Sequence, residues 1–226
     1  MNVDITLPDG SVRNFDSPVT GYQIAESIGP RLLKDAICIE IDNKFQDLSF
    51  EISENINIRI VTTKDLDALH ILRHSSAHIL AQAVLNLYPD AQFGVGPSIE
   101  NGFYYDFLFE TPIKENELEN IEKEMKRIAK SAQSFIRSEI TKKDAVKIFK
   151  NQKLKLELID SAESDEGVGE EIVSTYANEE FIDLCMGPHV PTTSVLKHFK
   201  LTKVSGAYWR GDESNVQLQR IYGTSW

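Results

Sequence analysis

Residues 73–78 read Arg-His-Ser-Ser-Ala-His and place two imidazoles, those of His74 and His78, four positions apart. Acidic residues around Asp65 suit the first turn of a helix and Pro89 ends one, so we predict a single helix between these two positions. Side chains four residues apart share one face of a helix. The two histidines could therefore reach the same ion or the same small substrate.

The surroundings of this histidine pair are apolar. No formally charged residue occurs from His74 to Tyr88, and a separate face of the predicted helix carries leucine and alanine. We interpret the histidine face as the floor of a cleft. Two core histidines whose hydrogen bonds are satisfied within the protein would give the same pattern, so both interpretations stay open at this point.

A second histidine motif lies far along the chain, where residues 183–189 read Asp-Leu-Cys-Met-Gly-Pro-His. Gly187 and Pro188 disfavour a helix, and a turn here would bring Cys185 and His189 to one side. With the first motif this gives three imidazoles and a thiol, a plausible tetrahedral ligand set for Zn²⁺. The same groups could hold a water molecule for metal-free hydrolysis, and the spacing does not separate the two.

Between the two motifs, Gly94 and Gly96 precede the aromatic run Phe103-Tyr104-Tyr105. The stretch lacks the Gly-Lys-Ser/Thr signature of a phosphate loop, so we do not predict nucleotide hydrolysis. Glycines have no side chain and would allow the backbone to approach a ligand closely. The tyrosines could stack on a base or lie in the core.

Residues 1–62 are typical of a small α+β domain. Apolar and polar residues alternate from Val3 to Leu7, which predicts a strand, and Asp9-Gly10 predicts a hairpin turn after it. A capping box beginning at Thr20 predicts a helix. This order of a hairpin, a helix and further strands resembles the ubiquitin-like β-grasp, and the domain shows no nucleophile–base pair or metal-ligand spacing.

The composition excludes several classes of protein. The chain has 226 residues and a net charge of −11, which argues against a general nucleic-acid coat protein, because neutralising phosphates requires clustered lysine and arginine. No apolar run is long enough for a membrane span, and the first residues lack the pattern of a secretory signal. The two cysteines, Cys38 and Cys185, rule out a disulfide scaffold and fit a reducing cytosol, so we expect a cytoplasmic protein.

The basic residues are unevenly distributed. Half of them, 12 of 24, lie in residues 114–155, where two charged helices are predicted at about 115–132 and 141–151. The stretch is typical of solvated helix surfaces, and it could also form a local basic surface that contacts a polyanion. The acidic segment 161–171 that follows predicts a solvated loop.

Four motifs, taken in their order along the chain, resemble the N-terminal part of bacterial threonyl-tRNA synthetases. They are residues 73–78, 96–97 with 101–106, 183–191, and 206–212 with 218–224. The resemblance covers essentially the whole chain and implies an α+β fold, with a β-grasp TGS domain at residues 1–62 and an α+β editing domain at residues 63–226. Alanyl-tRNA synthetase editing domains and their free-standing relatives share the two His/Cys motifs but normally lack the TGS domain.

The resemblance implies an enzyme, an aminoacyl-tRNA ester hydrolase that removes serine from mischarged seryl-tRNA(Thr). Serine is one methyl group smaller than threonine, and a missing methyl group provides only about 1–3 kcal/mol of discrimination. A synthetic site that accepts threonine therefore also admits serine, and a second pocket that is too small for threonine can hydrolyse the error. Hydrolysis of the ester requires an oriented water molecule, proton transfer and stabilisation of the oxyanion.

The resemblance also implies the roles of the site residues. The cleft would be lined by His74, His78, Cys185 and His189, with Asp183 recognising the substrate amine or hydroxyl, Lys155 assisting water activation or holding charge, and Gly96 and Tyr105 lining the pocket for the terminal adenosine. Lys155 lies in a basic run beside Lys153, so a solvated lysine is the other interpretation of this residue.

The resemblance to the threonyl enzymes implies a metal-free site, and we predict no cofactor. In the alanyl relatives the same four residues hold zinc, so the first alternative is a zinc-dependent alanyl-type deacylase with His74, His78, Cys185 and His189 as ligands. The second alternative is a non-catalytic RNA-binding or regulatory module, because TGS-like domains also occur in regulatory proteins.

The partner that the resemblance implies is the acceptor end of tRNA(Thr) carrying a seryl ester, with the basic stretch as a candidate contact, and no membrane is expected. Enzymes of this family continue into aminoacylation and anticodon-binding domains, for which the chain offers no candidate. We therefore expect an excised fragment that neither charges tRNA nor uses ATP. The family enzymes form homodimers through the catalytic core, so the fragment is expected to be monomeric.

Overall fold

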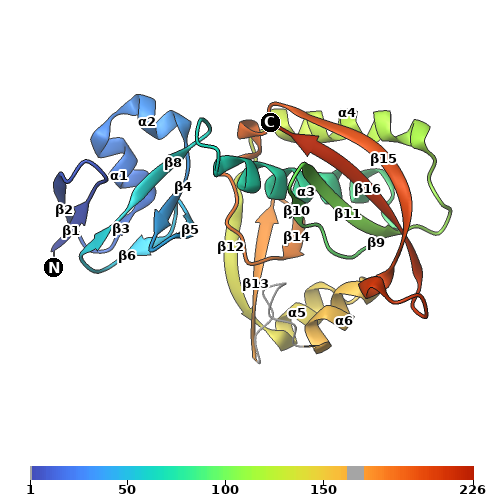
Figure 1. Ribbon diagram of the computed structural model, residues 1–226. Helices are drawn as coiled ribbons and strands as arrows, with labels where there is room; N and C mark the ends of the chain where they lie inside the picture. The colour runs from blue at the N-terminus through green and yellow to red at the C-terminus, as the bar shows by residue number, and fades with distance from the viewer. Residues whose placement is uncertain (1, 162–170) are drawn as a thin grey trace. The chain divides into compact units, whose positions relative to one another are not determined.

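The computed structural model describes residues 2–161 and 171–226, so the loop predicted at residues 161–171 lies almost entirely outside the described residues. The chain divides into two compact units, one running to Ile71 and including Gly187–Pro191, the other made of Leu72–Met186 and Thr192–Trp226. Figure 1 shows the elements of both units. Each unit contains helices and sheets, so the predicted mixed α+β class is confirmed.

The first unit consists of short strands and helices (Figure 1). In chain order these are β1 (Asn2–Thr6), β2 (Val12–Asp16), β3 (Val19–Thr20), α1 (Gly21–Ile28), α2 (Pro30–Asp35), β4 (Ala36–Ile41), β5 (Lys44–Asp47), β6 (Glu51–Ile52), β7 (Ile56–Asn57) and β8 (Arg59–Thr62). The strands pair in the orders β2-β1-β7, β5-β4-β8 and β3-β6. β1 is antiparallel to β2 and parallel to β7.

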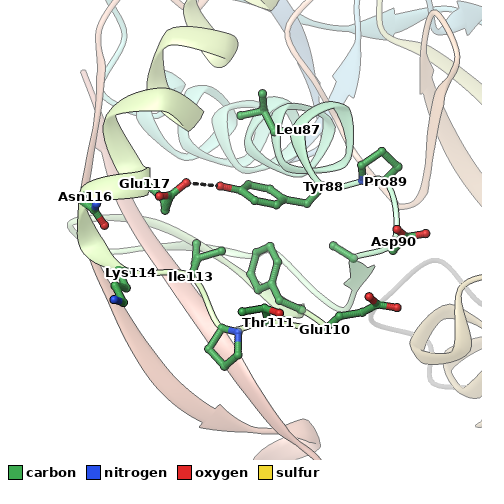
Figure 2. Close-up of a pocket in the computed structure, with 13 residues that line it drawn as sticks. Leu87, Tyr88, Pro89, Asp90, Glu110, Thr111, Ile113, Lys114, Asn116 and Glu117 are labelled. Carbon is green, nitrogen blue, oxygen red and sulfur yellow. Dashed lines mark hydrogen bonds between the residues drawn. The ribbon is translucent and has the colours of Figure 1, made fainter.

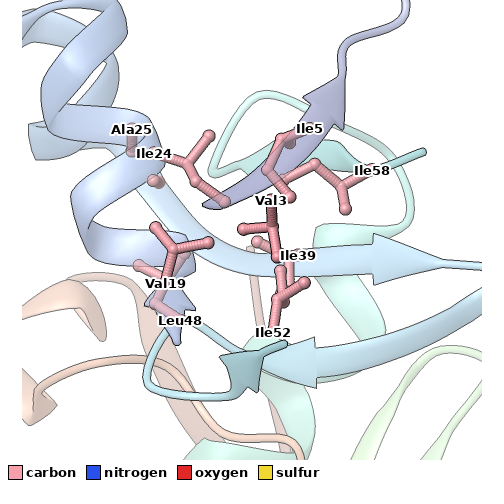
Figure 3. Close-up of a cluster of buried hydrophobic side chains, with 10 residues drawn as sticks. Val3, Ile5, Val19, Ile24, Ala25, Ile39, Leu48, Ile52 and Ile58 are labelled. Carbon is pink, nitrogen blue, oxygen red and sulfur yellow. The ribbon is translucent and has the colours of Figure 1, made fainter. Parts of the chain in front are cut away.

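The core of the first unit is an aliphatic cluster (Figure 3). Val3 and Ile5 lie on the inner face of β1, as the alternation predicts, and are almost fully buried. The predicted capping box is present, because the Gln23 N–H donates to the Thr20 hydroxyl and the Thr20 N–H donates to Gln23 Oε1 at 2.8 Å. The predicted turn has Gly10 at a φ of +81°, a conformation that favours glycine.

Helix α3 (Ala68–Leu87) carries the first histidine motif, which confirms the single predicted helix. It begins after Asp65, although the sequence predicts this residue in the first turn. Asp65 Oδ2 instead accepts hydrogen bonds from the N–H of Thr62 at 2.7 Å and from its hydroxyl at 2.8 Å. The residues of Ser75–Val84 are all buried, which explains why charged residues do not occur there.

The remaining elements belong to the second unit (Figure 1). They are β9 (Gln92–Phe93), β10 (Ser98–Ile99), β11 (Gly102–Leu108), α4 (Leu118–Lys130), β12 (Ile136–Thr141), α5 (Lys142–Ile148), α6 (Lys153–Ser161), β13 (Ile172–Asn178), β14 (Phe181–Leu184), β15 (Phe199–Tyr208) and β16 (Gln217–Ser225). One antiparallel sheet has the order β10-β11-β16-β15 with β9 on β11, and another has the order β12-β13-β14. α4 and α5 confirm the two charged helices that the sequence predicts.

These elements carry the predicted site residues at separate places in the fold: α3, β11, α6 and the end of β14. Within the described residues, no helix combines the length and the apolar character that crossing a membrane requires.

Candidate functional site

His74 and His78 lie one turn apart on α3, as the sequence predicts. His78 is 3% exposed, and its ring meets the rings of Phe135 and Phe181 edge-on, at centroid distances of 5.5 and 4.9 Å. Burial lowers the pKa of His78 to about 4, and the attraction of the Asp183 carboxylate offsets only part of this effect. His78 is therefore a neutral imidazole at neutral pH.

The thiol of Cys185 lies beside the first of these histidines. Cys185 Sγ is 3.0 Å from His74 Nε2, although the two residues are 111 positions apart in the chain. Ser174 on β13 fixes the backbone of Cys185, because it accepts the Cys185 N–H at 3.1 Å and its hydroxyl donates to the Cys185 carbonyl at 2.5 Å. The second unit thus brings the two motifs into contact.

Lys155 is fully buried on α6 and forms an ion pair with Asp183 on β14, with 2.5 Å between Nζ and Oδ1. The hydroxyl of Tyr105 donates to the other carboxylate oxygen and accepts a hydrogen bond from Lys155 Nζ at 3.2 Å. The ring of Phe93 lies against the ammonium group, with its centroid 4.8 Å from Nζ. Lys153 in the same run is exposed, so the solvated interpretation holds for Lys153 and is wrong for Lys155.

Gly96 packs directly on the ring of Tyr105. A Cβ atom at position 96 would lie 2.0 Å from Cδ2 of that ring, far inside the van der Waals contact distance. The loop is held in place by β-like bonds, because the Gly94 N–H donates to the carbonyl of Asp106 at 2.8 Å and the Asp106 N–H donates to that of Val95 at 3.0 Å. The two residues expected to line one pocket are therefore in contact, and the close approach requires glycine.

His189 lies in the segment Gly187–Pro191, which groups with the first unit. It is almost fully buried, and its backbone N–H donates to Asp47 Oδ1 at 2.9 Å. Gly187 has a φ of +73°, in agreement with the predicted turn at this point.

Two of the residues considered as metal ligands lie together in the second unit. The imidazole of His74 and the thiol of Cys185, 3.0 Å apart, are suitable ligands for Zn²⁺. The four-residue ligand set considered from the sequence, which adds His78 and His189, stays a prediction.

Several lysines of the basic stretch pair with acidic residues. On α4, Lys123 pairs with Glu119 at 3.0 Å and Lys126 pairs with Glu122 at 2.7 Å, each pair four residues apart on the same helix. These pairs favour the solvated-surface interpretation for α4, because the acidic partners offset the positive charge.

A cavity of about 570 Å³ lies between the end of α3 and the segment that follows β11 (Figure 2). The hydroxyl of Tyr88 donates to the Glu117 carboxylate across it at 2.7 Å, and the rings of Tyr88 and Phe109 meet edge-on at a centroid distance of 5.4 Å. The predicted site residues do not line this cavity. The volume of this cavity therefore does not identify the functional site. We assign the site from the reactive side chains that the fold brings together.

Sequence reasoning did not single out Phe93, Phe135 or Phe181, although they surround Lys155 and His78. Aromatic residues in and beside strands usually belong to the core, and their spacing in the sequence does not connect them to a lysine or a histidine. These residues keep the polar groups dry, which strengthens the electrostatic interactions between them.

Comparison with known proteins gives a consistent result. Residues 173–222 match the family described as "Threonyl and Alanyl tRNA synthetase second additional domain". The chain is 50% identical over 226 residues to a threonine–tRNA ligase of Ralstonia nicotianae, covering 99% of the chain and 35% of that protein. The ligase of Francisella philomiragia is 48% identical over 226 residues with the same coverage.

A more distant relative agrees with these two. The threonine–tRNA ligase of Desulfosudis oleivorans is 45% identical over 223 residues, covering 99% of the chain and 34% of that protein. The chain thus spans about a third of the length of the curated relatives it matches, and the similarity is to their N-terminal part.

Proposed function

We propose that the chain, which is similar over nearly its whole length to the N-terminal part of bacterial threonine–tRNA ligases, is an aminoacyl-tRNA editing module that hydrolyses mischarged seryl-tRNA(Thr). The observation that carries this proposal is the contact between the two motifs, with 3.0 Å between His74 Nε2 and Cys185 Sγ. An imidazole and a thiol this close together can both form hydrogen bonds to one water molecule and orient it for attack on the ester.

In this proposal the buried ion pair recognises the amino acid. The Asp183 carboxylate accepts hydrogen bonds from the amine or hydroxyl of serine. Lys155 is held at 2.5 Å from that carboxylate and supplies positive charge next to the ester, where negative charge develops. Tyr105 and Gly96, which are in contact, line the pocket for the terminal adenosine.

The reaction is ester hydrolysis. A water oxygen attacks the seryl carbonyl carbon and gives up a proton to an imidazole, the bond from this carbon to the ribose oxygen breaks, and the imidazolium returns the proton to the ribose oxygen. A neutral imidazole can accept a proton from water, whereas an imidazolium cannot. The low pKa of His78, about 4, makes its ring a weak base, so we assign the proton transfer to His74, whose Nε2 lies beside Cys185 Sγ.

The similarity to the ligases also supports a domain assignment. We assign residues 1–62 to a TGS domain of the β-grasp type and residues 63–226 to the editing domain. We propose the acceptor end of tRNA(Thr) as the partner and the cytoplasm as the compartment.

A zinc-dependent deacylase is a second candidate, because His74 and Cys185 lie 3.0 Å apart and are suitable zinc ligands. In this alternative they would hold the ion together with the other residues of the predicted ligand set, His78 and His189, and bound zinc would supply a water molecule of lowered pKa. Metal analysis of the purified protein separates the two candidates. Stoichiometric zinc and loss of activity on chelation would favour the zinc enzyme, and full activity after chelation would favour the metal-free one.

The proposed function is tested by incubating the protein with tRNA(Thr) carrying labelled serine or labelled threonine and measuring release of the amino acid. We expect serine to be released at least about tenfold faster than threonine, the size of effect that one methyl group provides. Equal release of both would contradict the size selection, and no release of serine would contradict the editing function.

A further inference from the structure

Helix α6 carries Lys155 on one side and is held on its other side by the turn between β15 and β16. Trp209 in this turn is 3% exposed, and its indole N–H donates to Glu157 Oε2 at 2.7 Å. The guanidinium of Arg210 donates to the Glu157 carbonyl at 3.3 Å. Lys155 and Glu157 are two residues apart, which places them about 200° apart around the helix. The hydrogen bond at Glu157 therefore opposes rotation of the helix that carries Lys155.

The same tryptophan ring also supports the loop that contacts Tyr105. A Cβ atom at Gly94 would lie 2.9 Å from Cζ3 of the Trp209 indole, so this ring packs directly on the glycine. Two residues further along this loop, Gly96 packs on the ring of Tyr105. One buried side chain thus contacts both α6 and the loop on which Tyr105 rests.

The start of α6 is fixed separately, by two glutamine side chains. The Lys153 N–H donates to Gln92 Oε1 at 2.7 Å, and the Phe93 N–H donates to Gln152 Oε1 at 3.2 Å. These bonds tie the first residue of the helix to β9. The turn of the helix that follows Lys155 is tied to the rest of the fold by the hydrogen bond between Trp209 and Glu157.

We infer that Trp209 and Glu157 are positioning residues for Lys155. The inference rests on the proposed function, in which Lys155 acts next to the ester. Nζ of Lys155 has to keep its ion pair with Asp183 and its hydrogen bond to Tyr105. A small rotation of α6 would break one of these two interactions. A displacement of about 1 Å can lower the rate of an enzyme by about 100-fold.

The first experiment separates the hydrogen bond from the packing of the ring. Trp209→Phe removes the indole N–H and keeps an aromatic ring on Gly94, Glu157→Ala removes the acceptor, and Glu157→Gln keeps an acceptor oxygen. We expect Trp209→Phe and Glu157→Ala each to lower kcat for serine release by about tenfold, with KM nearly unchanged. Glu157→Gln and the control Trp226→Phe, at a tryptophan that is 62% exposed, should stay near the wild-type rate.

The second experiment asks whether Trp209 acts through Lys155. Trp209→Phe is combined with Lys155→Ala, and the remaining rate is compared with that of Lys155→Ala alone. A positioning role predicts that the second substitution has no further effect, because the group that it misplaces is gone. A further loss of about tenfold in the Lys155→Ala background would show a general weakening of the fold and overturn the inference.

The third experiment does not depend on activity. Lysines of the full chain are labelled by reductive methylation, and Lys155 is followed by mass spectrometry with the exposed Lys153 as internal control. Lys155 is fully buried, so it should react slowly in the wild type and several-fold faster in Trp209→Phe and Glu157→Ala. Unchanged labelling at Lys155 overturns the inference. If labelling rises while the wild type releases no serine, the positioning stands and the proposed editing function fails.

Discussion

The ammonium group of Lys155 lies 2.5 Å from Asp183 Oδ1, and the two side chains are 0% and 5% exposed. Removing one partner of a buried ion pair leaves the other charge without compensation, which costs about 3–5 kcal/mol. Each member of the pair is therefore needed to compensate the buried charge of the other, in addition to its role in the proposed chemistry.

Replacing Lys155 by methionine should lower the free energy of unfolding by about 3 kcal/mol, because the Asp183 carboxylate then stays buried without its partner. Urea denaturation measures this change. Lys153→Met on the exposed side of the same helix is the matched control and should change stability by less than about 0.5 kcal/mol. Adding Asp183→Asn to Lys155→Met should restore part of the stability and none of the activity, because the uncompensated carboxylate is then removed.

Equal stability of wild type and Lys155→Met would contradict a buried ion pair.

Replacing Gly96 by alanine should displace the ring of Tyr105, since the new Cβ atom would lie 2.0 Å from Cδ2. We expect a loss of about 1–3 kcal/mol in the free energy of unfolding, as for other overpacked positions. Serine release should also fall, because Tyr105 holds both Lys155 and Asp183. Gly206→Ala is the control, since its Cβ atom would meet only the flexible end of a glutamine side chain. An unchanged melting temperature for Gly96→Ala would show that the loop moves freely.

The stability of the protein should depend on pH through His78. Its pKa is about 4 in the folded protein, below its usual value of 6.5, because burial disfavours the charged ring. The unfolded chain therefore binds a proton at higher pH than the folded protein. The contribution of this group to stability is complete above pH 6.5 and is lost as the pH falls toward 4, by up to about 3 kcal/mol.

Urea denaturation of wild type and His78→Gln at pH 7 and pH 4.5 isolates this contribution from that of the carboxylates. We expect the wild type to lose about 2 kcal/mol more than the variant between these two pH values, as the linkage of proton binding to folding requires. Identical pH dependence of the two proteins would mean that His78 titrates normally in the folded state.

Replacing His74 by alanine or Cys185 by serine should lower the rate of serine release by about 100-fold or more, the usual contribution of a side chain that takes part in proton transfer. Release of labelled serine from tRNA(Thr) measures the effect, and circular dichroism checks that the fold is retained. His198→Ala is the matched control, at an exposed histidine that stacks on Trp226. A wild-type rate for His74→Ala would remove this histidine from the proposed site.

The sequence predicts helix α3 well, because acidic residues near its start, a terminating proline and a charge-free stretch all agree around His74 and His78. The start of the helix is wrong by about one turn, since nothing in the sequence shows that Asp65 bonds back to Thr62. The contact between the two histidine motifs is not predicted by their spacing, because the residues in contact are 111 positions apart in the chain. It is expected only from the resemblance to a family.

The helical spacing of apolar residues around Lys155 is a signal of its burial. α6 buries Leu154, Lys155, Leu158 and Ile159, which share one face of a helix. Reading the lysine as part of this apolar face would have predicted a buried charge and the need for an acidic partner. Helical spacing does not identify Asp183 as that partner, because the pair depends on how helix α6 and strand β14 pack.

The continuous burial of Ser75–Val84 has a consequence for any mutational survey of this protein. In a saturation mutagenesis library selected for activity, substitutions at nearly every one of these positions should be depleted. This stretch of the helix has no solvent-facing side on which a different side chain could be accommodated. Depletion at His78 would then look no different from depletion at its apolar neighbours. Sorting the same library for folded protein as well as for activity would separate loss of chemistry from loss of structure.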